Sequence, residues 1–208
     1  LTQRNNLLKK LNFDNKYIDT LSVWDEQLAE YGSQIYILRN DFVNTINEKC
    51  SSIHSHLSGG KENLSITFIS NIKGNDKKEA YDNFISQLKK NQVNDIKRQI
   101  TQIGIHRDDI KLMLDDIEVR TQGSQGQKRT AALSLKLSEI EMMKDYSGEM
   151  PVLLLDDVFS ELDKSRRKWL LKYIKDIQTF ITCVDIESTL LKETDQVKIV
   201  KVVNGQLL

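Results

Sequence analysis

The sequence is poor in cysteine and proline, lacks a long apolar run and carries no net charge. Two cysteines, Cys50 and Cys183, are too few for a disulfide framework, and the lack of a signal peptide fits a reducing, cytoplasmic compartment. No apolar run approaches the roughly 20 residues that a membrane span requires. Thirty basic and thirty acidic side chains cancel, so binding to nucleic acid must come from a local patch.

Methionine is also missing from the first part of the chain, which starts at Leu1 and has its first methionine at Met113. We therefore expect that the complete protein has a further amino-terminal part. Hydrophobic residues make up 39% and charged residues 29% of the 208 positions, which is typical of a soluble protein with one large or two small domains. We predict a helical arm or insertion domain with one short strand at residues 1–103, and an α/β domain at residues 104–208.

The arm is predicted from the most regular apolar pattern in the sequence. Apolar positions recur at alternating steps of four and three, as in a coiled-coil seam: Tyr17, Leu21, Trp24, Leu28, Tyr31, Ile35, Leu38 and Phe42. The pattern continues to Leu57, and a helix over 17–57 would be roughly 60 Å long at ~1.5 Å per residue. A second helix over 76–103 offers a packing partner, and residues 64–70 alternate like a strand. The pattern alone fits a helical bundle with no mechanical role equally well.

Helices and strands alternate in the second part of the chain. The predicted strands are a hairpin over 110–119 that turns at Asp115 and Asp116, single strands over 152–155 and 180–184, and a final hairpin over 197–208. The predicted helices cover residues 127–144, 164–177 and 186–192. This order indicates an α/β layer.

The strand predicted over 152–155 carries the first candidate site. The only proline, Pro151, opens this short apolar run, which we interpret as a strand buried on both faces of a parallel sheet. Asp156 and Asp157 follow at its carboxyl end, where open α/β sheets bind ligands. One carboxylate there can hold Mg²⁺ beside nucleotide phosphates, and the second can orient an attacking water. The alternative for the run alone is a core strand followed by a polar turn.

The second candidate site is the segment 123–127 (Gly-Ser-Gln-Gly-Gln), which opens the helix that leads to that strand. Backbone N–H groups at a helix start point outward with the positive end of the dipole, ready for an anion. Ser124 adds a hydroxyl, and Gly126 permits a close approach of a phosphate. Lys128 and Arg129 lie beside them.

A second glycine motif at residues 57–61 (Leu-Ser-Gly-Gly-Lys) resembles both an ABC signature and the end of a P-loop. It lacks the glycine before and the hydroxyl residue after Lys61 that a P-loop needs. We interpret it as the carboxyl-terminal cap of the long helix.

Three stretches together resemble the RecF family of recombination mediators, whose members have an ABC-type ATPase head related to that of SMC proteins. They are residues 104–109 (Gly-Ile-His-Arg-Asp-Asp), 123–133 (Gly-Ser-Gln-Gly-Gln-Lys-Arg-Thr-Ala-Ala-Leu) and 153–163 (Leu-Leu-Leu-Asp-Asp-Val-Phe-Ser-Glu-Leu-Asp). The resemblance is dense over 104–208 and general over the arm. It implies the fold class α/β, as a partial ABC-type ATPase head (the signature and Walker B lobe) with a mainly helical arm.

The resemblance also implies roles for single residues. The signature motif, which contacts the γ-phosphate of ATP held by a partner subunit, would be Ser124, Gln125, Gly126 and Gln127. Asp156 would be the Walker B carboxylate that holds Mg²⁺ through water, and Asp157 stands where ABC transporters carry a catalytic glutamate. The D-loop at the dimer interface would be Ser160, Glu161, Leu162 and Asp163.

Other family positions stay open. Thr182 and Cys183 lie where the family often has a run of threonines, and the departure at Cys183 leaves the switch residue unassigned. His106 and Arg107 belong to the family pattern without a clear chemistry. An ion-pair cluster with Asp108 and Asp109 explains them at least as well.

The function that the resemblance implies is that of an ATP-dependent DNA-binding homodimer. Such a protein hydrolyses ATP slowly with Mg²⁺ and acts in recombinational repair, replication-fork maintenance and the SOS response. Its partners would be single-stranded DNA or double-stranded, gapped DNA, and mediator proteins such as RecR. Candidates for DNA contact are Arg166, Arg167 and Lys168, although such residues also fit a solvated helix face.

No Walker A loop occurs in the sequence, so we expect the chain by itself not to turn over ATP. Two alternatives remain from the sequence. One is another SMC-like ATPase head, and the other is a non-catalytic scaffold that binds a partner protein.

Overall fold

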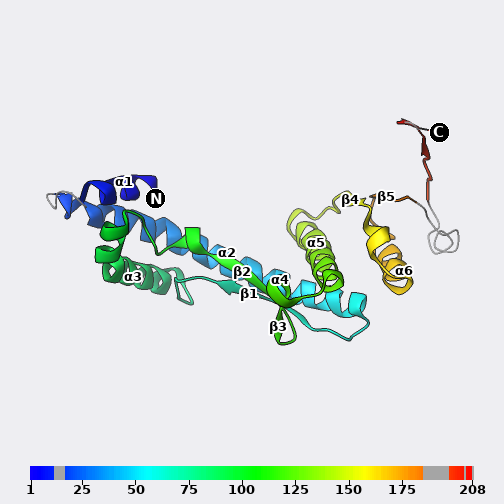
Figure 1. The fold of residues 1–208 in the computed structure, drawn as a ribbon, viewed down its shortest axis with the longest axis horizontal. Helices are drawn as coiled ribbons and strands as arrows, with labels where there is room; N and C mark the ends of the chain where they lie inside the picture. Colours follow the sequence, from blue (N-terminus) through cyan, green and yellow to red (C-terminus); the bar gives the residue numbers. More distant parts are fainter. Residues whose placement is uncertain (12–16, 185–196, 204, 208) are drawn as a thin grey trace. The chain divides into compact units, whose positions relative to one another are not determined.

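The chain forms two compact units in a computed structural model that describes residues 1–11, 17–184, 197–203 and 205–207 (Figure 1). Unit 1 comprises Leu1–Glu48 and Ser65–Met113, and unit 2 comprises Lys49–Leu64 and Leu114–Leu208. The predicted domains, 1–103 and 104–208, are continuous stretches, whereas the compact units are interleaved along the chain. Within the described ranges, no helix is both long enough and apolar enough to cross a membrane.

Unit 1 is mainly helical, as predicted. It contains α1 (Thr2–Leu11), the first part of α2 (Thr20–Ser58), α3 (Lys77–Arg98), η2 (Ile105–Arg107) and the strands β1 (Leu64–Ile69) and β2 (Asp109–Leu114). Helix α3 begins at the cap residue Asp76, whose carboxylate accepts a hydrogen bond from the Glu79 amide at 2.8 Å. The strands β1 and β2 belong to a three-stranded sheet in the order β1-β2-β3, with β3 at Ile117–Glu118.

A buried arginine joins the three helices of unit 1. The Arg4 side chain is fully buried, and its guanidinium donates to Asp25 at 2.6 Å and to Asp95 at 2.7 Å. It also donates to the Thr101 hydroxyl at 2.8 Å. Because removing one partner leaves a buried charge uncompensated, this network fixes how α1 lies against α2 and α3.

The apolar seam predicted for α2 is correct at its ends and wrong in its middle. Leu21, Ile46, Cys50, Ile53 and Leu57 are buried as the pattern placed them. Tyr31, Leu38 and Phe42 are 65%, 69% and 53% exposed, although the pattern placed them in the seam. In this middle part the buried stripe runs instead through Ala29, Gly32, Ser33, Tyr36 and Val43. The apolar count missed it because three of these residues are small. Small residues at a contact let a neighbouring side chain come close, and Phe84 of α3 occupies that place.

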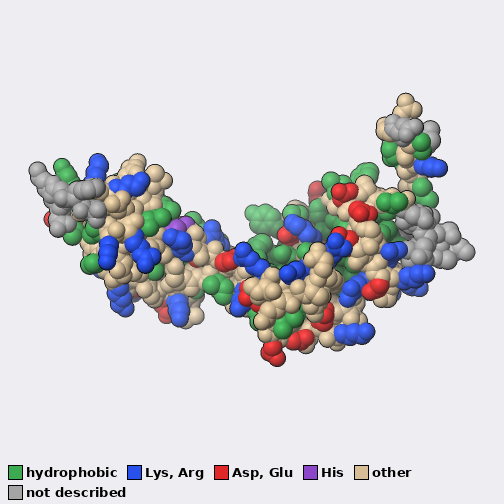
Figure 2. Space-filling view, viewed as in Figure 1, with side chains coloured by type: hydrophobic (Ala, Val, Ile, Leu, Met, Phe, Trp, Pro, Cys, Tyr) green, Lys and Arg blue, Asp and Glu red, His purple; other side chains and the backbone are tan. Residues whose placement is uncertain are grey.

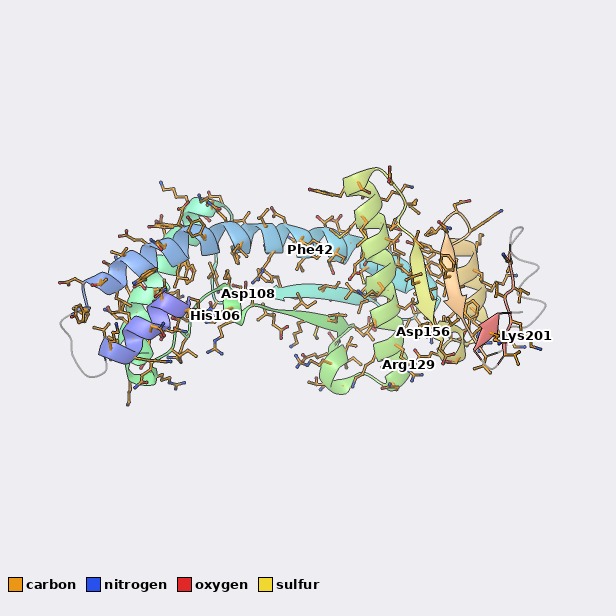
Figure 3. The ribbon with its side chains drawn as sticks, turned by 90° about the horizontal axis from the view of Figure 1, so that it is seen from above. Phe42, His106, Asp108, Arg129, Asp156 and Lys201 are labelled. Carbon is orange, nitrogen blue, oxygen red and sulfur yellow. The ribbon has the colours of Figure 1, made fainter. Side chains whose placement is uncertain are left out.

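The polar cluster at residues 106–109 has partners other than those predicted. Asp108 pairs with Arg39 of α2 at 2.8 Å, and the Arg39 guanidinium also donates to the Ile105 carbonyl at 2.6 Å. The His106 Nε2 atom lies 2.9 Å from the Thr101 carbonyl oxygen. Figure 3 shows His106 and Asp108 in this part of unit 1. These contacts tie the cluster to α2 and to the backbone at Thr101, so the cluster has a structural role within unit 1.

Unit 2 holds the α/β layer. It contains the end of α2, α4 (Val119–Gln122), α5 (Gln125–Ser147), β4 (Leu153–Asp156), η3 (Val158–Glu161), α6 (Lys164–Tyr173) and β5 (Thr179–Thr182). Strands β4 and β5 are parallel neighbours, with Asp156 opposite Thr182. A core formed by α2, α5, β4, η3 and α6 lies on one side of the two strands: Ile53, Leu57, Leu133, Leu137, Ile140, Leu153, Leu155, Phe159, Leu162, Leu170, Leu171, Ile174 and Ile177.

The prediction that β4 is buried on both faces is wrong. Leu153 and Leu155 are buried, whereas Leu154 on the other face is 73% exposed. Phe180 of β5 is exposed on the sheet as well. Figure 2 shows apolar side chains at the surface around α5 and β4. Among the residues that the structure describes, helices cover only one face of this pair of strands.

Several local predictions are confirmed. Helix α2 ends at Ser58, where Gly59 and Gly60 take positive φ values of 68° and 72° as its carboxyl-terminal cap. The final hairpin forms as β6 (Val202–Val203) and β7 (Gln206–Leu207), which are antiparallel, but its strands begin at residue 202 rather than 197. The helix predicted over 186–192 lies outside the described residues.

We predict that Gly32→Ala destabilises unit 1. A Cβ atom at position 32 would lie 2.5 Å from the Cε1 atom of Phe84, which is itself buried. Overpacking of this kind costs about 1–3 kcal/mol, whereas alanine in an open helix position stabilises by roughly 0.5–1 kcal/mol over glycine. Chemical denaturation measures the change in unfolding free energy.

The matched control is Gly126→Ala, because no atom lies within 4 Å of the added Cβ. This variant should be as stable as the wild type or slightly more so. Equal stabilities of the two variants would show that Phe84 moves aside without cost.

Candidate functional site

The start of α5 is built by a capping box. Ser124 is the N-cap: its hydroxyl accepts from the Gln127 amide at 3.3 Å, and the Ser124 amide donates to Oε1 of Gln127 at 2.9 Å. The amides of Gln125 and Gly126 follow in the first helical turn, where no preceding carbonyl can accept from them. Ser124, Gln125 and Gly126 are exposed, and the space beside Gly126 is open. This arrangement fits an anion at the helix start.

The carboxyl end of β4 brings the two predicted acids against a threonine of β5. The Thr182 hydroxyl donates to Oδ1 of Asp156. The Asp157 amide in turn donates to the Thr182 hydroxyl oxygen at 3.0 Å and to its carbonyl at 3.2 Å. Thr182 therefore orients the Asp156 carboxylate.

Asp157 lies in a left-handed backbone conformation with φ at 50°. Aspartate tolerates this region better than most residues. Its carbonyl accepts from the Ser160 amide at 3.3 Å and from the Ser160 hydroxyl at 2.9 Å. The chain thus turns sharply from the strand into η3, which leaves both carboxylates exposed at the sheet edge.

The predicted D-loop and the residue before it contain both buried and exposed side chains. Phe159 and Leu162 are buried in the core of unit 2, whereas Ser160, Glu161 and Asp163 are exposed. Asp163 caps α6 by accepting from the Arg166 amide at 2.9 Å. This backbone hydrogen bond, together with one from the Ser165 hydroxyl, lowers the pKa of the Asp163 carboxyl.

A groove of about 430 Å³ lies between α5 and β4. Arg129 and Lys136 of α5 and Asp156 of β4 are among the residues that line it, and apolar side chains form much of the rest. Arg129 pairs with Glu161 at 3.2 Å, so an ion pair links the first turns of α5 to η3. Figure 3 shows Arg129 on α5 and Asp156 at the end of β4.

The residues at Asp156 fit a magnesium ion with few protein ligands. One carboxylate oxygen of Asp156 accepts from Thr182, and the exposed side chain leaves the other oxygen accessible. Mg²⁺ usually keeps several waters and takes one or two carboxylates beside phosphates. No group of three or more His, Cys, Asp or Glu side chains that could hold a metal occurs in the described part of the chain.

Arg166 and Arg167, both predicted to contact DNA, donate hydrogen bonds to backbone carbonyls. The Nε atom of Arg166 donates to the Leu57 carbonyl at 3.1 Å, and that of Arg167 donates to the Leu162 carbonyl at 2.7 Å. Both side chains are partly buried, whereas Lys168 is exposed. The structure therefore favours the solvated or structural interpretation for the two arginines.

Comparison with known proteins gives one consistent result. No family model matches the chain. It is 43% identical over 205 residues to the DNA replication and repair protein RecF of Lachnoclostridium phytofermentans, covering 99% of this chain and 55% of that protein. It is 41% identical over 211 residues to RecF of Clostridioides difficile, covering 100% of this chain and 56% of that protein.

Solved structures agree. A structure of the recombination mediator protein RecF with an ATP analogue matches with a TM-score of 0.80 and 36% identity, covering 100% of this chain and 55% of that one. RecF with ATP matches with a TM-score of 0.79 and 39% identity over 90% of this chain and 51% of that one. The chain belongs to the RecF family. It spans about half the length of the RecF proteins it matches, and its fold class, a partial ABC-type head with a helical arm, is as predicted.

Sequence reasoning missed Glu62 at this site, and it named Thr182 and Arg129 without giving them these contacts. Thr182 contacts both acids, Arg129 pairs with Glu161, and Glu62 accepts a hydrogen bond from the Gln127 side chain at 2.7 Å. The contact of Thr182 could have been predicted, because a threonine and an acid at the ends of adjacent parallel strands lie side by side. No local pattern could have found Glu62, because 65 positions separate it from Gln127.

We predict that Asp163→Ala lowers the unfolding free energy by about 1 kcal/mol at pH 7, which is typical for loss of a cap. The folded carboxyl has a lowered pKa. Its stabilising charge is therefore fully present above the ordinary carboxyl pKa and is lost as the pH falls through the lowered value. Urea denaturation at several pH values measures the difference from the wild type.

The matched control is Asp163→Asn, which keeps a capping oxygen without the charge. Its stability should approach that of the wild type in acid. If the loss in Asp163→Ala were the same at every pH, the charge of Asp163 would have no part in the cap.

Proposed function

We propose that this chain provides the signature and Walker B part of a RecF-type, ATP-dependent DNA-binding protein in recombinational repair. The observation that carries the proposal is the pair of sites in unit 2: an anion-ready helix start at Ser124 and an oriented carboxylate at Asp156. Support comes from the likeness along the whole chain to RecF proteins, two of which were solved with ATP or its analogue. Residues 1–103 would act as the arm and 104–208 as the head.

The proposed mechanism uses two copies of the protein. Mg²⁺ bound beside Asp156 would supply charge stabilisation to the phosphates. Thr182 holds the Asp156 carboxylate in place, and Asp157 orients the attacking water from the same sheet edge. The helix start at residues 124–127 of the other copy binds the γ-phosphate through its amides and the Ser124 hydroxyl. ATP therefore joins two copies, with the exposed D-loop residues between them.

DNA and mediator proteins such as RecR are the proposed partners of this dimer. Among the candidate DNA contacts we retain Lys168, because its side chain is exposed on α6. Arg166 and Arg167 are secondary candidates, since each uses its Nε atom within unit 2.

We predict that Asp156→Asn in the complete gene product lowers ATP turnover at least about a hundredfold, which corresponds to roughly 2.7 kcal/mol. Asparagine keeps an oxygen that can accept from Thr182, so the fold should be retained. A steady-state phosphate-release assay measures turnover, and circular dichroism checks the fold.

Asp176→Asn is the matched control, because Asp176 is also an exposed acid in unit 2. Its turnover should equal that of the wild type. Unchanged turnover in Asp156→Asn would favour the alternative function, a scaffold in which the acids are structural.

We predict that Lys168→Gln flattens the salt dependence of DNA binding. One lost phosphate contact changes the slope of log K against log salt concentration by about 0.9 for duplex DNA. Fluorescence anisotropy titrations between low and moderate salt measure this slope. Lys9→Gln, an exposed lysine of α1, is the control, and an unchanged slope in Lys168→Gln would remove Lys168 from the DNA interface.

A further inference from the structure

Glu62 lies in the segment that follows α2, outside every motif that the proposed function uses. Its Oε1 atom accepts a hydrogen bond from Nε2 of Gln127 at 2.7 Å. At its other end, the same Gln127 amide accepts from the Ser124 backbone amide through Oε1 at 2.9 Å. The Gln127 side chain thus bridges the cap of α5 to the Glu62 carboxylate.

The side-chain amide of Gln127 can form both hydrogen bonds in only one of its two orientations. A carboxylate can only accept hydrogen bonds and a backbone N–H can only donate. If the Gln127 amide were turned by 180°, its oxygen would face the Glu62 carboxylate and its NH₂ group would face the Ser124 amide. Both contacts would then be repulsive. Glu62 therefore selects the amide orientation that completes the capping box.

The Glu62 carboxylate also lies against a buried histidine of α2. Its Oε2 atom lies 3.4 Å from Nε2 of His54, and neither atom has a hydrogen-bond partner among the described residues. The His54 side chain is fully buried, and its Nδ1 atom lies 3.0 Å from the hydroxyl of Ser134 on α5. The contacts from Ser134 to Gln127 therefore join the end of α2 to α5 at two places.

The charged groups around His54 all belong to unit 2. Burial lowers the pKa of His54, and the nearby Arg166 acts in the same direction. Glu62 and Asp115 oppose this shift. The Glu62 carboxylate is thus the negative charge in contact with the His54 ring, which is buried away from solvent.

We propose that Glu62 is a positioning residue for the helix start at 124–127. It fixes the Gln127 side chain, which in turn holds the Ser124 amide and hydroxyl in the arrangement that binds a phosphate. This inference rests on the proposed function, because the phosphate would be that of ATP held by a second copy. Glu62 itself touches no nucleotide.

The test exchanges the acid and the amide between positions 62 and 127 in the complete gene product. Gln127→Glu places two carboxylates together and should weaken ATP-dependent self-association about tenfold or more, the loss expected for a hydrogen bond to a charged group. Adding Glu62→Gln should restore it. The amide introduced at position 62 would donate to the carboxylate introduced at position 127, which still accepts from the Ser124 amide. Sedimentation velocity with and without ATP measures self-association.

The control pair is Gln127→Glu with Glu139→Gln. Glu139 is on α5 and pairs with Lys136 at 2.9 Å, so its change removes a negative charge from the same unit without touching the bridge. This pair should remain as weak as Gln127→Glu alone.

A second measurement covers variants that fold poorly. In Glu62→Ala, hydrogen exchange followed by mass spectrometry should show faster exchange of the segment around Ser124 than in the wild type. Equal exchange, or a double variant no better than Gln127→Glu, would overturn the positioning role while the wild type still assembles with ATP. If the wild type itself does not assemble with ATP, the proposed function fails and not only this inference.

Discussion

The packing of β4 against α5 and α6 is the constraint on which both candidate sites depend. Leu153 and Leu155 point to one side of the strand and join Leu133, Leu137 and Ile140 of α5 with Leu170 and Leu171 of α6. A buried leucine contributes about 1.5–3 kcal/mol, and because several such side chains act together, the core as a whole outweighs any single polar contact at the site. This core sets where α5 starts and where β4 ends, so the chemistry at the two ends follows from apolar packing.

The sequence predicted well what short segments decide. The helix start at Ser124 and the helix end at Gly59 and Gly60 lie where the sequence predicted them, because a cap needs only its own neighbours. The paired acids after the apolar run lie at the end of a parallel strand, as that run indicated. Each of these features depends on about four consecutive residues.

The sequence predicted poorly what tertiary contacts decide. The seam of α2 was wrong in its middle because Gly32 and Ser33 lie in the buried stripe there, and no apolar count gives weight to small residues. The burial of Leu154 was wrong because a continuous apolar run does not say whether a second layer covers it. The contact of Thr182 was not foreseen and Glu62 was missed, because their partners lie 26 and 65 positions away. For these features the fold itself supplies the information.

Two kinds of contact hold the motif residues, and their strengths differ. Arg129 and Glu161 are both more than a third exposed, and such a pair contributes only about 0.2–1 kcal/mol. Phe159 and Leu162 on either side of Glu161 are buried, so they and not the ion pair determine where η3 lies. At Gln127 the balance is reversed: its bridge ends on the partly buried Glu62 carboxylate, where a hydrogen bond to a charged group is worth about 1.5–3 kcal/mol. The helix start is therefore held more firmly by polar contacts than the loop that follows the acids.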